Sequence, residues 1–480
     1  MQKFKTSKIL RCIVQKKTVQ KRLFKKDCLK NRLKKVILEN TIENNLHHII
    51  IVGGGAGGLE LATSLGDSLG KSKKALITLI DSTRTHVWKP LLHEIAAGSM
   101  NPDKHELDYL AQAHWHHFSF RLGRMDGLDR ANKEVTIAPY FDEDGVEVIQ
   151  RRTFKYDTLV IAIGSTTNDF GIKGAREHSI AIDTQEQAEK FHRRLHNAMV
   201  RAQTQTALFQ AGQLDVVIVG AGATGVELAA ELHNTTRELT AYGLDKIDPD
   251  RDIKISIIEA SDRVLPALPH KLSMAVDLEL RKLRVHVYAG ERVTEVAEKG
   301  VLTHSGRFIP SALVVWAAGI KAPDFLKDLD GLETNRINQL VVKQTMQTTV
   351  DDNIFAFGDC AACPWLGHDG NVPPRAQAAH QQASTLVGTM KKRVAGKTNF
   401  TEYQYRDYGS LVNLGRYSTV GSLMGAISGS SMFIEGLFAR VMYRSLYKMH
   451  LVSLHGVIAV ALQTIARWIS RGTEAHVKLH

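Results

Sequence analysis

The sequence predicts an α/β fold with two Rossmann-like dinucleotide-binding domains, followed by a C-terminal region of amphipathic helix. Two observations indicate the domains. An apolar strand, a glycine-rich turn, a helix and a strand with an acidic end follow one another in this order twice. Two later strands end in small residues, as expected of strands that leave a nucleotide domain. The 480 residues are enough for two such domains and one further region.

The first unit begins with the run 48–52, a short β-branched segment of the kind buried in parallel sheets. The glycine-rich turn 53–58 follows directly, and residues 59–65 form a predicted helix. The next strand, 76–80, ends in Asp81. This arrangement, with G-x-G-x-x-G between a strand and a helix, is typical of a dinucleotide-binding unit.

The second unit repeats the first. The strand 216–219 leads into the turn 220–225 and the helix 226–232, and the strand 253–258 ends in Glu259. A single glycine motif is a weak signal. Two motifs, each between a strand and a helix and each followed by a strand-end acid, predict two dinucleotide-binding domains.

Each glycine of these turns has a separate task. The first permits the tight turn, the second lets a pyrophosphate approach the backbone, and the third lets the helix pack on the strand. These glycines are Gly53, Gly55 and Gly58 in the first unit and Gly220, Gly222 and Gly225 in the second. The N-terminus of each helix then offers free N–H groups to the phosphates.

The acids at the strand ends bear on which nucleotide binds. Asp81 and Glu259 are placed to accept hydrogen bonds from adenosine ribose hydroxyls. A carboxylate also repels a 2′-phosphate, so Glu259 favours NADH over NADPH. Arg263 is close enough in sequence that NADPH stays open.

Two later strands end in small residues, and a third ends in a Gly-Asp pair. Residues 158–164 end in Gly164, residues 313–319 end in Gly319, and residues 353–359 end in Gly358 and Asp359. Asp359 can accept hydrogen bonds from ribityl hydroxyls, while Gly358 lets the backbone come close to a ligand.

This order of motifs resembles the two-dinucleotide-binding-domain flavoproteins, with FAD at the first glycine motif and a nicotinamide nucleotide at the second. Within that superfamily, residues 86–94, 316–323 and 373–381 resemble the bacterial type II NADH:quinone oxidoreductases. The resemblance covers the chain from about residue 46 to its C-terminus. It implies an FAD domain split between 46–168 and 320–400, an NADH domain at 169–319, and a membrane-docking region at 401–480.

The resemblance implies a reaction and a location. NADH would be oxidised with two-electron reduction of a membrane quinone, without proton pumping, in the respiratory chain. The enzyme would hold FAD non-covalently and lie peripherally on the cytoplasmic face of the bacterial inner membrane. Whether the quinone is ubiquinone or menaquinone stays open.

The resemblance also implies site residues. FAD would be held by Gly53, Gly55, Ala56, Gly57, Gly58, Asp81, Ser82, Lys89, Met125, Gly164, Gly358, Asp359 and Ala376. NADH would be held by Gly220, Gly222, Thr224, Gly225, Glu259 and Gly319. No metal site is expected.

Three further residues are expected to take part in catalysis. Gln377 and Gln381 are four positions apart, so they share one face of a helix that starts after a Pro-Pro pair. In the family this helix borders the quinone pocket, and amides can donate to quinone carbonyls without adding charge. Glu227 lies in the first turn of the second-unit helix, and its family counterpart reaches toward the flavin and nicotinamide.

The positions of the cysteines restrict which electron acceptor the reduced flavin can have. Residues 29–359 contain no cysteine, so reduced flavin has no protein disulfide there to reduce. Cys360 and Cys363 form a C-x-x-C spacing without a second pair, which lacks ligands for a closed zinc site. Packing beside the flavin domain is the favoured interpretation, with a redox or soft-metal role as the alternative.

The formal net charge of +12 is carried by the N-terminal extension, because residues 1–40 hold 14 Lys and Arg against one Asp and one Glu. The remaining chain is neutral, which argues against nucleic-acid binding by the folded body. Residues 1–45 are expected to be disordered. A targeting segment, an anionic-membrane contact and a misplaced start codon all stay open.

The pattern of residues in the C-terminal region predicts contact with a membrane. From Phe433 and Ile434 onward, apolar residues recur at helical spacing, flanked by Arg440, Arg444 and Lys448. Residues 449–466 carry no formal charge, but polar residues interrupt them, so an interfacial helix is favoured over a spanning one. A dimer contact is the alternative for this region.

Two other functions stay open from the sequence. One is a soluble FAD- and NADH-dependent reductase of a redox protein, with the C-terminal helices as its homodimer contact. The other is a nucleotide-sensing protein that binds FAD without turnover.

Overall fold

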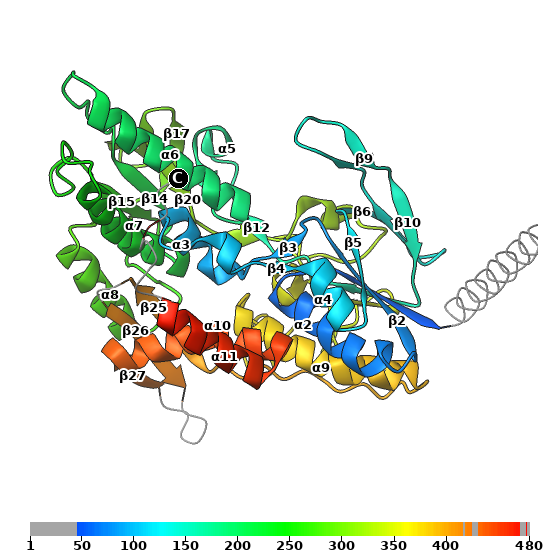
Figure 1. Ribbon diagram of the computed structural model, residues 1–480. Helices are drawn as coiled ribbons and strands as arrows, with labels where there is room; N and C mark the ends of the chain where they lie inside the picture. Colours follow the sequence, from blue (N-terminus) through cyan, green and yellow to red (C-terminus); the bar gives the residue numbers. More distant parts are fainter. Residues whose placement is uncertain (1–45, 416–417, 425–430, 471–476, 478–480) are drawn as a thin grey trace, which may run out of the picture.

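The computed structural model describes residues 46–415, 418–424, 431–470 and 477, and its core is two parallel sheets (Figure 1). The predicted α/β class is confirmed. The basic extension lies outside the described residues, so its predicted disorder stays a prediction.

The first sheet has five parallel strands in the order β23-β11-β1-β2-β5. They are β1 (His47–Val52), β2 (Ala75–Asp81), β5 (Ser119–Leu122), β11 (Thr158–Ile161) and β23 (Ile354–Ala356). The apolar run of β1 pairs on both sides and is at most 2% exposed, as expected of a central parallel strand. Helices α2 (Ala56–Leu65) and α9 (Ala376–Val394) pack together and share its apolar core.

The second sheet repeats this plan in the order β13-β20-β14-β15-β16. Its strands are β13 (Ile180–Ala181), β14 (Val216–Val219), β15 (Ile255–Glu259), β16 (His286–Ala289) and β20 (Leu313–Trp316). The accompanying helices are α6 (Gln185–Thr204), α7 (Ala223–Ala241) and α8 (His270–Lys282).

Two chain segments connect the sheets and pair with each other as an antiparallel ribbon, β12 (Thr166–Thr167) and β21 (Ile320–Lys321). The chain therefore leaves the first sheet after β11, builds the second, and returns to add β23. One helix departs from the expected division. Although α3 (Leu92–Ala97) precedes the connection, it packs on α6 and α7, and its Leu92 and Ile95 belong to the second core.

The remaining elements before residue 401 are short. In the first domain they are β3 (Thr85–His86), β4 (Leu107–Asp108), α4 (Tyr109–Trp115), β6 (Met125–Asp129), β7 (Glu134–Ile137), β8 (Tyr140–Phe141), β9 (Glu147–Ile149), β10 (Arg152–Lys155), β22 (Leu340–Val341) and β24 (Ala361–Ala362). In the second they are α5 (Ala175–His178), β17 (Val293–Ala297), β18 (Gly300–Thr303) and β19 (Phe308–Pro310).

The C-terminal region begins with an antiparallel sheet that the sequence analysis missed. Its strands are β25 (Gly409–Leu414), β26 (Ser418–Met424) and β27 (Ser431–Glu435), and it packs on α7 and α8. The prediction of a helix from Phe433 and Ile434 is therefore wrong at its start. These residues pair with β26, and α10 (Gly436–His455) begins after them.

The uncharged stretch 449–466 is divided between two helices. Gly456, with φ +79°, separates α10 from α11 (Val457–Ser470). A left-handed glycine at this point ends the first helix and redirects the chain. Within the part of the chain that the structure describes, every helix is too short or too polar to span a bilayer.

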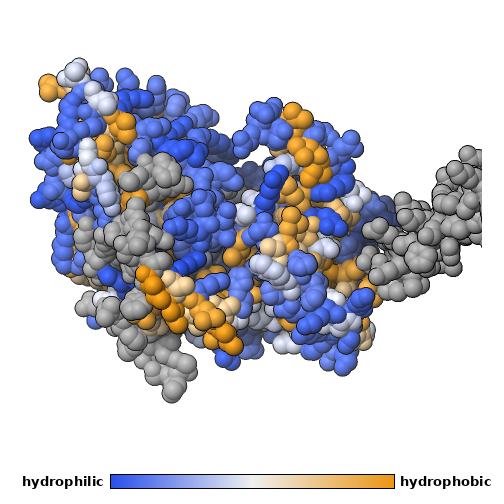
Figure 2. All heavy atoms as spheres, viewed as in Figure 1, coloured by the Kyte–Doolittle hydropathy of each residue, from blue (hydrophilic) through white to orange (hydrophobic). Residues whose placement is uncertain are grey.

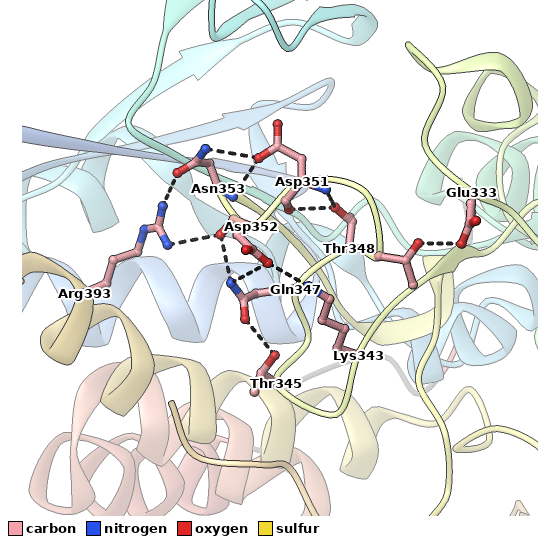
Figure 3. Close-up of polar contacts among 10 residues, drawn as sticks. Glu333, Lys343, Thr345, Gln347, Thr348, Asp351, Asp352, Asn353 and Arg393 are labelled. Atoms are coloured by element: carbon pink, nitrogen blue, oxygen red, sulfur yellow. Dashed lines mark hydrogen bonds and ion pairs between the residues drawn. The ribbon is translucent and has the colours of Figure 1, made fainter. Parts of the chain in front are cut away.

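Polar contacts fix the strand that carries the Gly-Asp pair (Figure 3). Arg393, in the last turn of α9, donates to the main-chain oxygen of Asp352 (3.1 Å) and contacts Asn353 Oδ1. Its Nε also donates to Thr158 Oγ1 (2.7 Å) at the start of β11. These contacts tie α9 to two neighbouring strands of the first sheet.

Candidate active site

One cavity of about 1850 Å³ is lined by both glycine turns, by α9 and by α10. The turns follow β1 and β14, so the cavity lies at the carboxyl ends of both sheets, where open α/β sheets bind ligands. Pockets for one drug-sized ligand usually measure roughly 300 to 1,000 Å³. This cavity therefore has room for more than one ligand.

Each glycine turn is closed by its strand-end acid in the same way. The Gly54 N–H donates to Asp81 (2.6 Å), and the Ala221 N–H donates to Glu259 (2.8 Å). The main-chain N–H two residues after each acid donates to the other carboxylate oxygen, at 2.8 Å in both units. Glu259 lines the cavity, whereas Asp81 does not, so Asp81 acts here by shaping its turn.

The two helices after these turns present anion sites. α2 begins after Gly55 and α7 after Gly222, and neither has a side-chain cap. A Cβ atom added at either glycine would meet no atom within 4 Å. Free N–H groups beside open cavity space fit a pyrophosphate in each unit.

Most of the residues predicted to bind cofactors line the cavity. They are Gly55, Ala56, Gly57, Gly58, Lys89, Gly164, Gly358, Asp359, Ala376, Gly220, Gly222, Thr224, Glu259 and Gly319, together with Glu227, Gln377 and Gln381. Five do not line it: Gly53, Gly225, Asp81, Ser82 and Met125. Gly53 and Gly225 lie within the turns, and Met125 is 2% exposed in the first core.

A line of polar contacts runs across the cavity wall between the domains. Ser165 donates from Oγ to Asp359 Oδ2 (2.8 Å), and its main-chain oxygen accepts from Lys89 Nζ (2.9 Å). Lys89 also pairs with Asp183 of the second domain (3.3 Å). The predicted residues Lys89 and Asp359 are thus brought together through Ser165.

Glu227 is buried in the cavity wall, 6% exposed. Its Oε1 accepts from the Asn413 N–H (2.9 Å), and its Oε2 lies 3.7 Å from His93 Nδ1. Burial raises the pKa of Glu227 to about 8, and the nearby carboxyl of Glu94 adds to this. Burial also lowers the pKa of His93 to about 4. At neutral pH the pair is therefore a carboxylic acid beside a neutral imidazole.

The two glutamines on α9 make hydrogen bonds to a later segment that the sequence did not predict. Gln377 donates to Asp407 and to the Gly409 main-chain oxygen, both at 3.2 Å. Gln381 donates to the Arg406 main-chain oxygen (2.8 Å) and accepts from the Arg406 N–H (3.0 Å). Both side chains line the cavity, but their amides hold the segment 406–409 in place.

Among the titratable residues that line the cavity, Glu60, His93, His380 and His450 were not predicted to be site residues. The sequence does contain one indication that Glu60 belongs to the site. It follows Gly58 by two positions, as Glu227 follows Gly225, so the two carboxylates occupy equivalent places in the repeated units.

Cys360 and Cys363 are free, buried thiols. Burial raises their pKa values to about 12 and about 11, which leaves them protonated and unreactive at neutral pH. Among the described residues, no cluster of three or more His, Cys, Asp or Glu could hold a metal ion. Packing in the first core is thus the interpretation that fits these cysteines.

Comparison with known proteins agrees with this geometry. The model of the pyridine nucleotide-disulphide oxidoreductase family matches residues 47–383. A type II NADH:quinone oxidoreductase of Haemophilus influenzae is 42% identical over 448 residues, which cover 91% of this chain and 100% of that protein. The enzyme of the same name from Staphylococcus aureus NCTC 8325 is 27% identical, covering 78% of this chain and 90% of that one.

Solved structures share the fold. NDH2 from Plasmodium falciparum in complex with NADH aligns with a TM-score of 0.73 at 19% identity, covering 90% of this chain and 100% of that one. The sulfide:quinone oxidoreductase of Aquifex aeolicus aligns with a TM-score of 0.65 at 18% identity, covering 88% and 95%. At these identities the likeness concerns the fold.

The glycines of the first turn should respond differently to alanine. A Cβ at Gly58 would lie 1.9 Å from the Gly53 main-chain oxygen, so Gly58→Ala forces the turn apart. We expect it to lower the free energy of unfolding by about 1 to 3 kcal/mol or more. Gly55→Ala should fold normally but retain less FAD, because its methyl group enters the cavity. Thermal melting measures the loss of stability, and the flavin-to-protein ratio measures the loss of FAD. If both variants lost stability and FAD to the same extent, the separate roles given to Gly58 and Gly55 would be contradicted.

The buried acid should leave a signature in the pH dependence of stability. Between its ordinary pKa of 4.5 and its folded pKa of about 8, Glu227 keeps a proton in the folded state that it loses on unfolding. The free energy of unfolding therefore falls as pH rises through this range. Glu227→Gln removes this contribution, so the midpoint of thermal unfolding should fall less steeply between pH 4.5 and 8, with a residual slope from Glu94. The exposed Glu177→Gln is the control, and a parent-like slope in Glu227→Gln would show an ionised Glu227.

Proposed function

The chain belongs to the type II NADH:quinone oxidoreductases of the pyridine nucleotide-disulphide oxidoreductase family, and we propose how the cavity between its two glycine turns carries out their reaction. It is an FAD-dependent enzyme that oxidises NADH and reduces quinone. The observation that carries the mechanism is that two nucleotide-binding turns line a single cavity together with Glu227 and α9.

The first turn holds FAD and the second holds NADH in this proposal. Gly55 and Gly222 leave room for the two pyrophosphates at the N-termini of α2 and α7. Glu259 lies at the far end of the second site, where it accepts from the adenosine ribose and disfavours NADPH. Bound FAD supplies the redox chemistry, since a flavin takes up a hydride and releases two electrons.

The chain's own residues orient the reactants. Glu227, neutral at physiological pH, can donate a hydrogen bond toward the nicotinamide side without placing a negative charge there. Gln377 and Gln381 support the quinone side by fixing residues 406–409, whose Tyr408 lines the cavity. The Gln377 amide uses both of its N–H bonds on Asp407 and Gly409, so donation to a quinone carbonyl falls to Gln381, whose amide makes one of its two donations to Arg406.

A membrane quinone is insoluble in water, and the C-terminal helices offer a route to it. The face of α11 exposes Val457, Ile458, Leu462, Ile465 and Ile469, each 56–78% accessible. Figure 2 shows hydrophobic side chains gathered over α10 and α11. We assign this surface to the lipid of the inner membrane's cytoplasmic face, where NADH and quinone are both present.

The three basic residues predicted to flank the apolar side of the C-terminal helix are only partly exposed. Arg444 is exposed, whereas Arg440 and Lys448 are half-buried. Apolar insertion by α11 is therefore the larger contribution to docking in this proposal, and electrostatic attraction the smaller one.

The reaction is tested with the full-length, FAD-loaded chain under anaerobic conditions. NADH should bleach the flavin absorbance, and a water-soluble short-chain quinone should restore it, with one quinol formed per NADH. NADPH should reduce the flavin more slowly, because Glu259 disfavours the 2′-phosphate. If reoxidation requires a haem or iron–sulfur protein instead of quinone, the soluble-reductase function replaces this one. If NADH fails to bleach the flavin, the chain is a nucleotide sensor.

Membrane docking is tested by placing charge on the exposed face of α11. Burying one such side chain is worth about 1.5 to 3 kcal/mol, so the double variant Ile458→Asp with Leu462→Asp should weaken vesicle binding roughly a hundredfold or more. Leu208→Asp is the matched control, since Leu208 is 93% exposed in the second domain. Sedimentation with phospholipid vesicles measures the effect. Unchanged vesicle binding together with loss of a dimer in solution would assign this surface to a second copy of the chain.

A further inference from the structure

A hydrogen-bonded cluster connects the cavity to α10. Glu60 Oε1 lies 2.7 Å from His450 Nδ1, and Glu60 Oε2 lies 2.6 Å from His380 Nδ1. His450 Nε2 lies 2.9 Å from His86 Nε2, and His86 Nδ1 lies 2.9 Å from the Gly54 main-chain oxygen. Glu60, His86 and His450 are at most 6% exposed. We call Glu60, His86, His380 and His450 the Glu60 cluster.

The hydrogen bonds of the cluster require one more proton than neutral His86 and His450 would carry. A carbonyl oxygen only accepts, so His86 Nδ1 carries a proton toward Gly54. A second proton lies between the two facing Nε2 atoms, and a third lies between His450 and Glu60. Two neutral imidazoles hold two protons in total. The buried group of His86, His450 and Glu60 therefore carries one more proton than two neutral imidazoles and a carboxylate.

The position of the cluster suits proton transfer to a bound ligand. Glu60, His380 and His450 line the cavity, and the ring of His450 stacks on Trp88, another lining residue (centroids 6.1 Å apart, planes at 13°). The side chain of His380 is 40% exposed, so it joins the buried carboxylate to solvent. The cluster thus has one member, His380, that solvent can reach, and two buried members, Glu60 and His450, in the same cavity wall.

The proposed reaction consumes a proton that NADH does not supply. Quinone becomes quinol by gaining two electrons and two protons, whereas the hydride of NADH carries two electrons and one proton. The second proton must enter a cavity whose wall is largely apolar. A group that already holds a proton at this wall shortens that transfer.

We propose that His450, His86 and Glu60 store the second proton that quinone consumes, and that His380 replaces it from solvent. This inference rests on the function proposed above. The second O–H bond of the quinol forms as one of the two N–H bonds that His450 holds within the cluster breaks. A proton that enters from solvent through His380 and Glu60 re-forms that N–H bond, and the two electrons come from NADH. Because His450 belongs to α10, the proton store is complete only when the C-terminal helix is seated.

The electrostatics of the cluster support this arrangement. Burial lowers the pKa of His86 to about 3, so His86 is the neutral imidazole of the group. The hydrogen bond that His380 donates to Glu60 raises the pKa of His380. Burial alone would raise the pKa of Glu60, but its bonds to the two histidines outweigh burial and lower it.

The groups that face the cluster come from every element packed against it. They are Glu60 on α2, His86 on β3, Tyr109 on α4, His380 on α9, and His450 and His455 on α10. A pH profile of proton delivery therefore reports the coupled group rather than one histidine.

The test separates the two half-reactions of the full-length, FAD-loaded enzyme. Flavin reduction by NADH and flavin reoxidation by a short-chain quinone are followed anaerobically from pH 5.5 to 9, for the parent, His450→Gln and Glu60→Gln. Loss of a general acid typically costs about 10²- to 10⁴-fold in rate. We expect reoxidation to slow on the order of a hundredfold in both variants, with a changed pH profile, while reduction by NADH is retained. Added imidazole should restore part of the rate in His450→Gln.

The matched control is His196→Gln, a half-buried histidine on α6 of the second domain that does not line the cavity. It should reoxidise as the parent does. Parent-like reoxidation and pH profile in folded, flavin-loaded His450→Gln would overturn the proposal. So would slowing of both half-reactions without imidazole rescue, since that outcome is expected of a purely structural clamp on α10. Failure of the parent itself to reduce quinone would instead overturn the proposed function.

Discussion

The third glycine of each turn leaves no space for a side chain, and the geometry of the whole cavity depends on that constraint. A Cβ at Gly58 or Gly225 would lie about 2 Å from the main-chain oxygen of the first glycine in its turn. Helix and strand can therefore pack closely enough for each helix N-terminus to face the cavity. Because the turns sit at the carboxyl ends of two sheets, two nucleotides can meet there through their reactive rings.

The C-terminal region completes the site as well as offering the apolar surface. The N–H of Asn413 in β25 donates to Glu227, and His450 of α10 contacts Glu60. These two carboxylates follow their glycine turns at equivalent positions, and each is held by an element from the C-terminal region. The surface assigned to lipid and the residues assigned to chemistry are therefore parts of one continuous segment. Docking and reactivity can be coupled through it without a separate hinge.

Local pattern was enough to predict the two nucleotide-binding units, because a strand, a glycine turn and a helix are specified within about 35 residues. It failed where partners distant in sequence decide the structure. Phe433 has helical spacing to later apolar residues, yet it lies in a strand that pairs with β26. The contact between Glu60 and His450 joins residues 390 positions apart, so no spacing could reveal it. The glutamines of α9 were placed correctly, but their partners at 406–409 were not foreseeable.

The central claim is that FAD and NADH share one cavity with their rings facing each other. A crystal structure of the chain with FAD and NAD⁺ tests it most directly. The account predicts the FAD pyrophosphate at the N-terminus of α2 and the NAD⁺ pyrophosphate at the N-terminus of α7. The nicotinamide and isoalloxazine rings should lie in contact between Glu227 and α9. Density that places NAD⁺ outside the cavity, or holds the two rings apart on different sides of α9, would contradict it.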